Sequence, residues 1–283
     1  MNIQTITKTL IDAGIEPNEA KCEIKILLEH FCNYTDSDWA RGIFPDEHQL
    51  EILNEKVKLR TEKRLPVQYI TGEAWFMGEF FKVSPDVLIP RDETEILVTA
   101  AIETIKEKGL NTVLDIGTGS GCIACTIAKK TNATVLGVDI SSDALRIALD
   151  NVTKLGINNR AVFRKSDLFN KVRAEEKFDL IISNPPYIPF GTELSPEVQH
   201  EPSLALFAEE NGICIYRKII EQAPNFLNKK GYIMFEIGIG EAESIVKLLT
   251  KDFTNISVKK DLAGIDRVVI AQLKNNEVSA GCS

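Results

Sequence analysis

Apolar residues recur at helical spacing through the N-terminal quarter of the chain. Ile3, Ile6 and Leu10 keep this spacing, and it returns within residues 20–31 and 50–57. A spacing of three and four residues gathers apolar side chains on one face of a helix. Strand patterns are scarce here. Residues 1–74 are therefore predicted to form a small bundle of short amphipathic helices.

The pattern changes at Trp75, where "WFMGEFFKVSPDVLIP" alternates and becomes rich in aromatic and β-branched residues. Such alternation predicts a short hairpin, which makes residues 75–90 a linker. A helix is expected next, because Asp92 and Glu95 have the capping-box spacing ahead of an apolar run.

Strand and helix patterns alternate through most of residues 91–283. Helices are expected over residues 143–155 and 213–227. This alternation predicts an α/β fold, with a mostly parallel sheet covered by helices on both faces. The last two strands surround a glycine-containing turn, which predicts an antiparallel end to the sheet. The predicted strands are "NTVLDIG", "ATVLGVDI", "RAVFRKSD", "FDLIISN", "GYIMFEIG" and the pair in "ISVKKDLAGIDRVVIAQL".

Composition and charge narrow the possible partners. The net charge of −8 disfavours stable nucleic-acid binding, because a surface that grips phosphates is usually basic. No apolar stretch is long enough to span a bilayer, and the start of the chain lacks a secretory pattern. A cytoplasmic protein, working as a monomer, is expected. The three histidines are far apart in the sequence, so no metal site is expected.

Two local patterns have ordinary structural interpretations. Cys122 and Cys125 form a C-x-x-C at the start of a predicted helix. We interpret them as thiols that fill a contact between helix and sheet, not as a redox site. Several basic side chains within residues 56–64, Arg60 among them, fall on one helix face. We interpret this face as solvated, with a contact for a polyanion as the alternative.

The stretch "VLDIGTGSGCIA" places three glycines between a predicted strand and a helix, with Asp115 at the strand end. Gly117, Gly119 and Gly121 permit a tight turn and the close approach of a ligand to the backbone. The dinucleotide-binding fingerprint fails at its last glycine, where Cys122 stands, and the Walker pattern is absent.

Acidic residues end the next two predicted strands. Asp139 lies twenty residues after Gly119, where a carboxylate can accept both ribose hydroxyls of an adenosine. Asp167 could accept from the adenine amino group, and Leu168 could pack on the ring. All these residues are at carboxyl ends of strands, where open α/β sheets bind ligands. The sequence therefore predicts a site for a ligand that contains adenosine.

The following strand ends in Asn184-Pro185-Pro186-Tyr187, and the prolines stop it because they cannot donate to the sheet. The side-chain oxygen of Asn184 and the carbonyl of Pro185 are two acceptors that can hold both N–H bonds of a planar NH2 group. Tyr187 can lie flat against that group. Such a nitrogen is a poor nucleophile. If it receives a methyl group, holding its face toward the methyl carbon could take the place of a base that removes its proton. We interpret the corner as a clamp for an amide or amino nitrogen.

These features resemble the class I S-adenosylmethionine-dependent methyltransferases, a Rossmann-like α/β fold with a mostly parallel seven-stranded sheet and an antiparallel last strand. "RLPVQYITGEAWFMGEFFKVSPDVLIPRDETEILV", "VQHEPSLALFAEENG" and "DLAGIDRVV" also resemble the HemK/PrmC family. The resemblance implies methyl transfer from S-adenosyl-L-methionine, leaving S-adenosyl-L-homocysteine. The implied acceptor is the N5 amide nitrogen of the glutamine in the Gly-Gly-Gln motif of peptide chain release factors.

The resemblance also implies roles for regions and residues. Residues 1–74 would dock the release factor, and residues 91–283 would form the methyltransferase domain. Asn184 to Tyr187 would hold the glutamine amide, and Arg91 and Glu93 would help to close the site. The implied cofactor-binding residues are Asp115, Gly117, Thr118, Gly119, Ser120, Gly121, Asp139, Ile140, Asp167, Leu168 and Asn184.

The chain departs from the family pattern at two positions. Asp92 replaces a usual proline, and an aspartate can still cap a helix there. Leu168 stands where many members have an aromatic residue, which weakens an expected stacking contact with adenine. Three alternatives stay open: a glutamine methyltransferase that acts on a ribosomal protein, an adenine or guanine N-methyltransferase that acts on nucleic acid, and a cofactor-binding regulatory module without catalysis.

Overall fold

A computed structural model describes residues 2–275, which form two compact units. Of the described residues, unit 1 contains 2–73 and 194–200, and unit 2 contains 74–193 and 201–275. The short second segment of unit 1 is therefore flanked in sequence by unit 2 on both sides. None of the helices in the described range has the length and apolar character that a membrane span requires.

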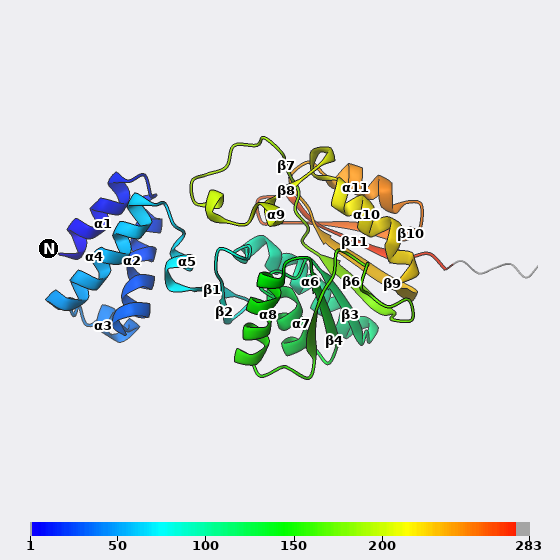
Figure 1. Cartoon of the computed structure of the whole chain (residues 1–283), viewed down its shortest axis with the longest axis horizontal. Coiled ribbons are helices and arrows are strands. Elements are labelled where there is room, and N and C mark those ends of the chain that lie inside the picture. The colour runs from blue at the N-terminus through cyan, green and yellow to red at the C-terminus, as the bar shows by residue number, and fades with distance from the viewer. Residues whose placement is uncertain (1, 276–283) are drawn as a thin grey trace, which may run out of the picture. The chain divides into compact units, whose positions relative to one another are not determined.

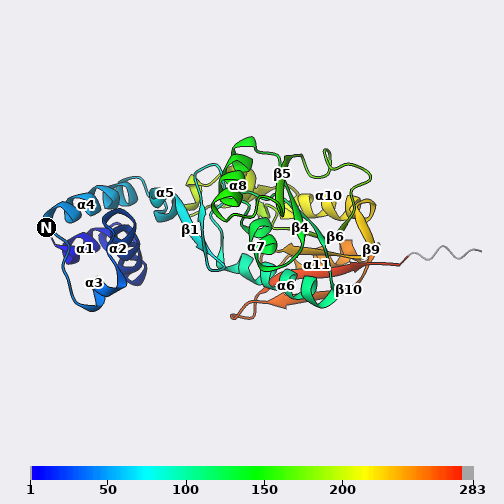
Figure 2. The same cartoon turned by 90° about the horizontal axis from the view of Figure 1, so that it is seen from below.

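Unit 1 is a bundle of helices, as the apolar spacing predicts (Figure 2). Ile6, Leu10, Leu27 and Leu53, all at predicted apolar positions, lie buried in its core. Helices α3 and α5 are only five residues long, so no repeat of helical spacing could reveal them. The elements of this unit are α1 (Ile3–Asp12), α2 (Pro17–Cys32), α3 (Asp36–Ala40), α4 (Glu47–Glu62), α5 (Val67–Thr71) and the 3₁₀ turn η1 (Val198–His200).

The predicted hairpin is confirmed in the segment that follows the bundle. Strands β1 (Glu73–Phe76) and β2 (Glu79–Lys82) form a two-stranded sheet. The two residues between them, Met77 and Gly78, have φ angles of 53° and 94°. Positive φ at both positions is what a two-residue hairpin turn of type I′ requires.

Helix α6 (Asp92–Lys108) begins where the sequence predicts, but the capping-box interpretation is wrong. Asp92 is the first helical residue, and the N-cap residue Arg91 makes no side-chain capping bond. The carboxylate of Glu95 instead accepts a hydrogen bond from the backbone N–H of Met77 at 2.7 Å. This bond joins the helix to the hairpin turn, and a rule based on local spacing cannot identify such a distant partner.

Unit 2 contains a seven-stranded sheet in the order β10-β11-β9-β6-β3-β4-β5. The five strands from β9 to β5 are mutually parallel, and β11 is antiparallel to both of its neighbours. The predicted class I architecture, with its antiparallel last strand, is therefore confirmed. The strands are β3 (Thr112–Ile116), β4 (Thr134–Asp139), β5 (Ala161–Lys165), β6 (Phe178–Ser183), β9 (Leu227–Glu236), β10 (Phe253–Lys260) and β11 (Asp266–Leu273).

Side chains alternate between the two faces of this sheet, and helices cover both faces (Figure 1). Val113 and Leu180 pack into one core with α6 and α7, whereas Leu114 and Ile181 pack into a second core with α10 and α11. Burial on both faces explains why the strands read as nearly continuous apolar runs. The remaining long helices are α7 (Cys122–Lys130), α8 (Ser142–Lys154), α10 (Cys214–Gln222) and α11 (Ala242–Leu249).

The two cysteines of the C-x-x-C pattern are buried in the first of these cores. Burial raises the pKa of the Cys122 thiol to about 12. A thiol with such a pKa stays protonated and behaves as a small apolar group. Our interpretation of Cys122 and Cys125 as packing residues therefore agrees with the structure.

The helix expected over residues 213–227 ends earlier than predicted. Helix α10 stops at Gln222 and is followed by the 3₁₀ turn η3 (Ala223–Asn225), because Pro224 cannot continue an α-helix. Leu227 is already the first residue of β9. Short elements that the sequence did not predict are β7 (Ile188–Pro189), α9 (Ser203–Leu206), β8 (Phe207–Ala208) and η2 (Glu210–Gly212).

The interpretation of a solvated basic face on α4 is wrong for Arg60, of which only 2% is exposed. Its Nε donates to both carboxylate oxygens of Glu23, at 2.9 and 3.0 Å, and its Nη1 donates to Glu197 at 2.7 Å. Glu23 comes from α2, and Glu197 comes from the second segment of unit 1. Helical spacing placed Arg60 correctly on its helix but could not show these partners.

Candidate active site

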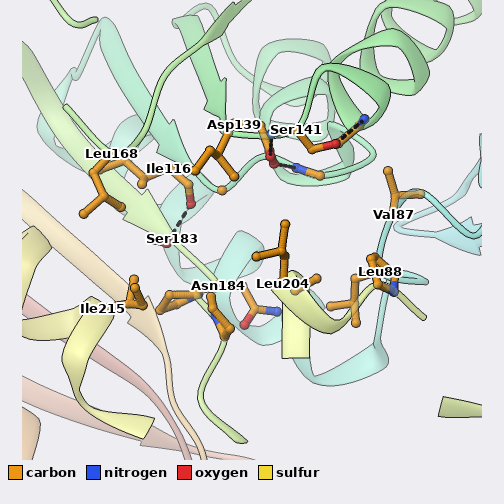
Figure 3. Close-up of a pocket in the computed structure, with 18 of the residues that line it drawn as sticks. Val87, Leu88, Ile116, Asp139, Ser141, Leu168, Ser183, Asn184, Leu204 and Ile215 are labelled. Carbon is orange, nitrogen blue, oxygen red and sulfur yellow. Dashed lines mark hydrogen bonds between the residues drawn. The ribbon is translucent and has the colours of Figure 1, made fainter. Parts of the chain in front are cut away.

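A cavity of about 290 Å³ lies at the carboxyl ends of β3, β4, β5 and β6 (Figure 3). Figure 3 shows Asp139 and Asn184 on opposite sides of this cavity, with Leu204 reaching into it from α9. This is the edge at which open α/β sheets bind ligands. The predicted site residues that line the cavity are Gly117, Gly119, Asp139, Ile140, Asp167, Leu168, Asn184, Pro185 and Pro186.

The glycine loop forms one wall of the cavity. Gly117, Gly119 and Gly121 have φ angles of 72°, 54° and 77°, a backbone conformation that residues with a side chain rarely adopt. A Cβ atom at Gly117 or Gly119 would meet nothing within 4 Å, so the space above the loop is open to a ligand. At Gly121, by contrast, a Cβ atom would lie 3.1 Å from the Cβ of Ala148. That glycine therefore permits close helix packing and does not line the cavity.

The carboxylate of Asp139 fixes the glycine loop from the end of β4. The backbone N–H of Gly119 donates to its Oδ2 at 2.9 Å, and that of Ser141 donates to its Oδ1 at 2.8 Å. Burial raises the pKa of Asp139, although these two hydrogen bonds oppose the shift. Each oxygen keeps a further lone pair, so the carboxylate can still accept hydrogen bonds from a diol.

Besides Gly121, three predicted cofactor-binding residues do not line the cavity and are buried: Asp115, Thr118 and Ser120. Asp115 is fully buried and accepts a hydrogen bond from the hydroxyl of Thr118 at 2.6 Å. Burial raises the pKa of Asp115 to about 7. Because these side chains face inward, their contribution is to hold the loop in shape.

The far end of the cavity is bounded by residues after β4 and β5. Ile140 is 51% exposed, and Asp167 is also exposed. Leu168 has a φ of 46°, and its carbonyl accepts a hydrogen bond from the hydroxyl of Ser166 at 2.7 Å. This bond holds the turn that directs Leu168 toward the cavity.

The proline corner forms the opposite wall, directly after β6. The hydroxyl of Ser183 donates to the carbonyl of Ile116 at 2.7 Å, which ties the end of β6 to β3. Tyr187 does not line the cavity but packs beside Gly238, where an added Cβ atom would lie 3.0 Å from its ring. Burial raises the pKa of the Tyr187 hydroxyl to about 12. Tyr187 is therefore neutral and held in place by packing.

Arg91 and Glu93 also lie outside the cavity lining. Arg91 forms an ion pair with Glu201, which is buried and also accepts a hydrogen bond from the backbone N–H of Ile89 at 3.1 Å. Glu93 lies 3.5 Å from the guanidinium of Arg267. Arg91 therefore braces the backbone that leads into α6, and Glu93 links α6 to β11. Their part in closing the site over a substrate stays a prediction.

The geometry brings a pair of hydrogen-bond acceptors, the Asn184 side chain and the Pro185 carbonyl, to the same cavity as the glycine loop. This arrangement can orient a planar NH2 group toward a ligand bound on the loop. Within residues 2–275, no group of three or more histidine, cysteine, aspartate or glutamate residues is placed to hold a metal ion.

Comparison with known proteins identifies the family. The chain is 41% identical over 225 residues to a release factor glutamine methyltransferase of Fusobacterium nucleatum subsp. nucleatum, covering 78% of this chain and 63% of that protein. It is 42% identical over 215 residues to a protein of the same name from Geobacter sulfurreducens, covering 74% of each. The chain belongs to the release factor glutamine methyltransferase family. The resemblance that the sequence motifs indicated is thereby confirmed.

Two broader likenesses agree with this family. A family of methyltransferase domains matches residues 107–277, which include the glycine loop and the proline corner. The crystal structure of a ribosomal protein L11 methylase from Lactobacillus delbrueckii subsp. bulgaricus is 26% identical, with a TM-score of 0.51. The match covers 68% of this chain and 84% of the methylase chain.

In this member of the release factor glutamine methyltransferase family, two residues behind the corner escaped the sequence analysis. The side-chain Nδ2 of Asn184 donates to the hydroxyl of Thr94 at 3.2 Å, and that hydroxyl donates to the carboxylate of Glu236 at 2.6 Å. Glu236 ends an apolar strand, as Asp139 does, so the same signal could have found it. Thr94 carried no such signal, because it is one polar residue within a helix.

Proposed function

We propose that this chain transfers the methyl group of S-adenosyl-L-methionine to the N5 amide nitrogen of the glutamine in the Gly-Gly-Gln motif of peptide chain release factors. The observation that carries the proposal is one cavity lined by both the glycine loop with Asp139 and the Asn184–Pro186 corner. The names of the relatives that are 41% and 42% identical support the choice of substrate.

The residues of the cavity fit the methyl donor. The open backbone at Gly117 and Gly119 suits its amino acid part, and the remaining lone pairs of Asp139 suit its ribose hydroxyls. Leu168 offers an apolar surface for adenine, and Asp167 offers an acceptor for the adenine amino group. When bound, the donor supplies a methyl group attached to a positively charged sulfur.

Asn184 and Pro185 would orient the acceptor. Their two oxygens accept the two N–H bonds of the glutamine amide, which turns the face of the nitrogen toward the methyl carbon. The nitrogen would then accept the methyl group that the bound donor supplies, and the electron pair of the broken carbon–sulfur bond would remain on sulfur. The surplus proton on nitrogen leaves to water. The same oxygens favour the positive charge that develops on the nitrogen, so no strong base is required.

We also propose that unit 1 docks the release factor, a role that follows only from the family resemblance. The chain is expected to work as a monomer in the cytoplasm. Its net charge of −8 argues against stable binding to nucleic acid, and its acceptor would be a protein.

The direct test offers three acceptors separately to the purified chain with labelled S-adenosyl-L-methionine: a peptide chain release factor, ribosomal protein and nucleic acid. We expect label in the release factor alone. A release factor whose motif glutamine is replaced by alanine is the matched control and should remain unlabelled. Label in that control, or in nucleic acid only, would overturn the proposal.

The proposed clamp is tested by Asn184→Ala. Removing one of the two acceptors should lower kcat by about 10²–10³-fold, because the lost hydrogen bond is strongest in the transition state. Affinity for S-adenosyl-L-methionine, measured by calorimetry, should change far less. Asn159→Ala, in an exposed turn before β5, is a matched control that should leave both quantities unchanged. Equal turnover by wild type and Asn184→Ala would exclude the clamp.

A glutamine methyltransferase that acts on a ribosomal protein is the second candidate. The likeness to the ribosomal protein L11 methylase favours it, since the identity of 26% extends over 68% of this chain. The three-acceptor assay separates the two candidates, because label in the ribosomal protein without label in the release factor would select the second.

A further inference from the structure

We propose that Thr94 and Glu236 are positioning residues that fix which way the side-chain amide of Asn184 faces, so that its oxygen is presented to the substrate nitrogen. The inference rests on the proposed function, because it concerns how the clamp obtains its acceptor. Neither residue lines the cavity, so both would act through Asn184.

The three residues come from separate elements that meet behind the corner. Thr94 lies in the first turn of α6, Asn184 follows β6, and Glu236 is the last residue of β9, the neighbour of β6 in the sheet. Thr94 and Glu236 are each only 2% exposed. Water therefore has little access to the hydrogen bonds that join Asn184 to Thr94 at 3.2 Å and Thr94 to Glu236 at 2.6 Å.

The direction of these hydrogen bonds follows from the number of protons available. An ionised carboxylate only accepts, so the single hydroxyl proton of Thr94 must point to Glu236. The Thr94 oxygen then has only lone pairs left for Asn184, and the amide must turn its NH2 side to Thr94. The amide oxygen consequently faces the other way. A reversed amide would set its oxygen against the threonine lone pairs in a buried place, which is unfavourable.

Orientation matters here because the two ends of an asparagine amide are nearly equal in size and opposite in function. With the oxygen presented, Asn184 accepts an N–H bond of the substrate amide. With the nitrogen presented, it would donate toward a nitrogen whose hydrogens already point at it. Packing alone discriminates poorly between two groups of the same shape, whereas a hydrogen bond of fixed direction discriminates well.

The charge state of Glu236 connects this device to pH. Burial raises the pKa of Glu236 to about 7, although side-chain hydrogen bonds from Thr94 and Asn184 oppose the shift. A neutral Glu236 can donate to Thr94, which frees the threonine proton to point at Asn184 and permits the reversed amide. The titratable groups whose charges act on Glu236, or whose own titration it affects, are Glu93, Arg267, Tyr187, Tyr216 and Cys122.

The first test compares Thr94→Val with Thr94→Ser. Valine keeps the volume and removes the hydroxyl, so kcat should fall by about 10–100-fold, the range typical of lost supporting hydrogen bonds. Serine keeps the hydroxyl and should restore kcat to near the wild-type value. Affinity for S-adenosyl-L-methionine should be unchanged in both variants. Thr126→Val, at a buried threonine whose hydroxyl has no hydrogen-bond partner among the described residues, is the matched control and should keep wild-type kcat.

The second test follows kcat against pH in wild type and Glu236→Gln. Wild type should lose activity as pH falls through about 7. Glutamine cannot ionise, so the variant should lack this acidic limb and show a lower, flat kcat. A purely structural role for the buried pair would lower stability without removing the limb. An acidic limb that persists in Glu236→Gln, or a Thr94→Val variant with wild-type kcat, would overturn the inference.

A third readout separates failure of this inference from failure of the proposed function. The side-chain NH2 signals of Asn184, assigned in ¹⁵N NMR spectra by their loss in Asn184→Asp, should shift and exchange faster in Thr94→Val but not in Thr126→Val. If wild type leaves release factors unlabelled while these signals behave as expected, only the proposed substrate is wrong. If the signals are the same in wild type and Thr94→Val, the orientation mechanism is wrong whatever the substrate.

Discussion

Glu23 in unit 1 and Glu236 in unit 2 are both almost completely buried, but the two carboxylates are stabilised in different ways. The two residues are 3% and 2% exposed. Glu23 receives two hydrogen bonds from the charged guanidinium of Arg60. Glu236 receives its side-chain hydrogen bonds from neutral groups, the hydroxyl of Thr94 and the amide of Asn184. The first carboxylate therefore has a full opposite charge beside it, and the second does not.

The difference shows that a buried acid can either stabilise the fold or take part in the chemistry of a site. A buried charge with a hydrogen-bonded partner of opposite sign stays ionised, and removing either partner is costly. Glu197 and Glu23 raise the pKa of Arg60 although burial opposes them, and Arg60 opposes the rise that burial causes in the pKa of Glu23. Among residues 2–275, no side chain of opposite charge lies at hydrogen-bond distance from the Glu236 carboxylate, and its pKa of about 7 leaves its charge adjustable. Groups of this kind are concentrated at functional sites.

The largest change in the free energy of unfolding is expected from Arg60→Ala. The change leaves Glu23 buried without its partner, and the free energy of unfolding of unit 1 should fall by about 3–5 kcal/mol. Urea denaturation followed by helical circular dichroism measures the change. Arg41→Ala removes an exposed pair with Asp38 and is the control, with an expected loss below about 1 kcal/mol. Similar losses in both variants would show that the buried cluster contributes little.

A smaller effect of opposite sign is expected from Glu236→Gln. The folded state raises the pKa of this group from 4.5 to about 7, so the native protein binds the proton more tightly than the unfolded chain. Its contribution to stability is complete below pH 4.5 and is lost as pH rises through about 7. The variant should therefore exceed wild type in stability at about pH 8, by no more than about 3 kcal/mol.

This gain should disappear when the denaturation is repeated below pH 4.5, where the wild-type carboxyl is neutral in both states. Asp115, whose pKa is also raised to about 7, titrates in both proteins, so its effect cancels in the difference. A variant that is less stable than wild type at both pH values would show that the Glu236 carboxylate is adequately paired.

The smallest effect is expected from Glu197→Gln. Glu197 is partly exposed and contacts both Arg60 and Arg64, and glutamine keeps an acceptor while losing the charge. Unit 1 should lose about 1–2 kcal/mol. The segment Leu194–His200 should also be cut faster in limited proteolysis, because its hydrogen bond to α4 is weakened. An unchanged rate of cleavage would mean that other contacts hold the segment.

Periodicity predicted those parts of the fold that depend on neighbours in the sequence. The alternation of strands and helices gave the sheet and its antiparallel last strand, because apolar runs such as "FDLIIS" report burial on both faces. Local rules failed where a distant residue supplied the partner. Glu95 caps no helix end because Met77 occupies its carboxylate. Arg60 looked solvated because its acidic partners lie 37 and 137 residues away.

The candidate site shows the same division. Strand ends and glycines drew attention to Asp139 and Asn184, which line the cavity. The motif alone could not show that Asp115 faces inward or that Tyr187 packs beside Gly238. Their orientation is set by tertiary packing, and a sequence pattern records only their order along the chain.

The passage of Leu194–His200 into unit 1 means that the chain crosses between the units three times. A single backbone break between residues 73 and 74 would consequently leave the fragments joined by noncovalent contacts around Arg60. Deletion of the first 73 residues would instead remove the residues that Leu194–His200 contacts within unit 1. Any attempt to minimise this enzyme to its sheet must therefore re-engineer an internal loop as well as remove a terminus.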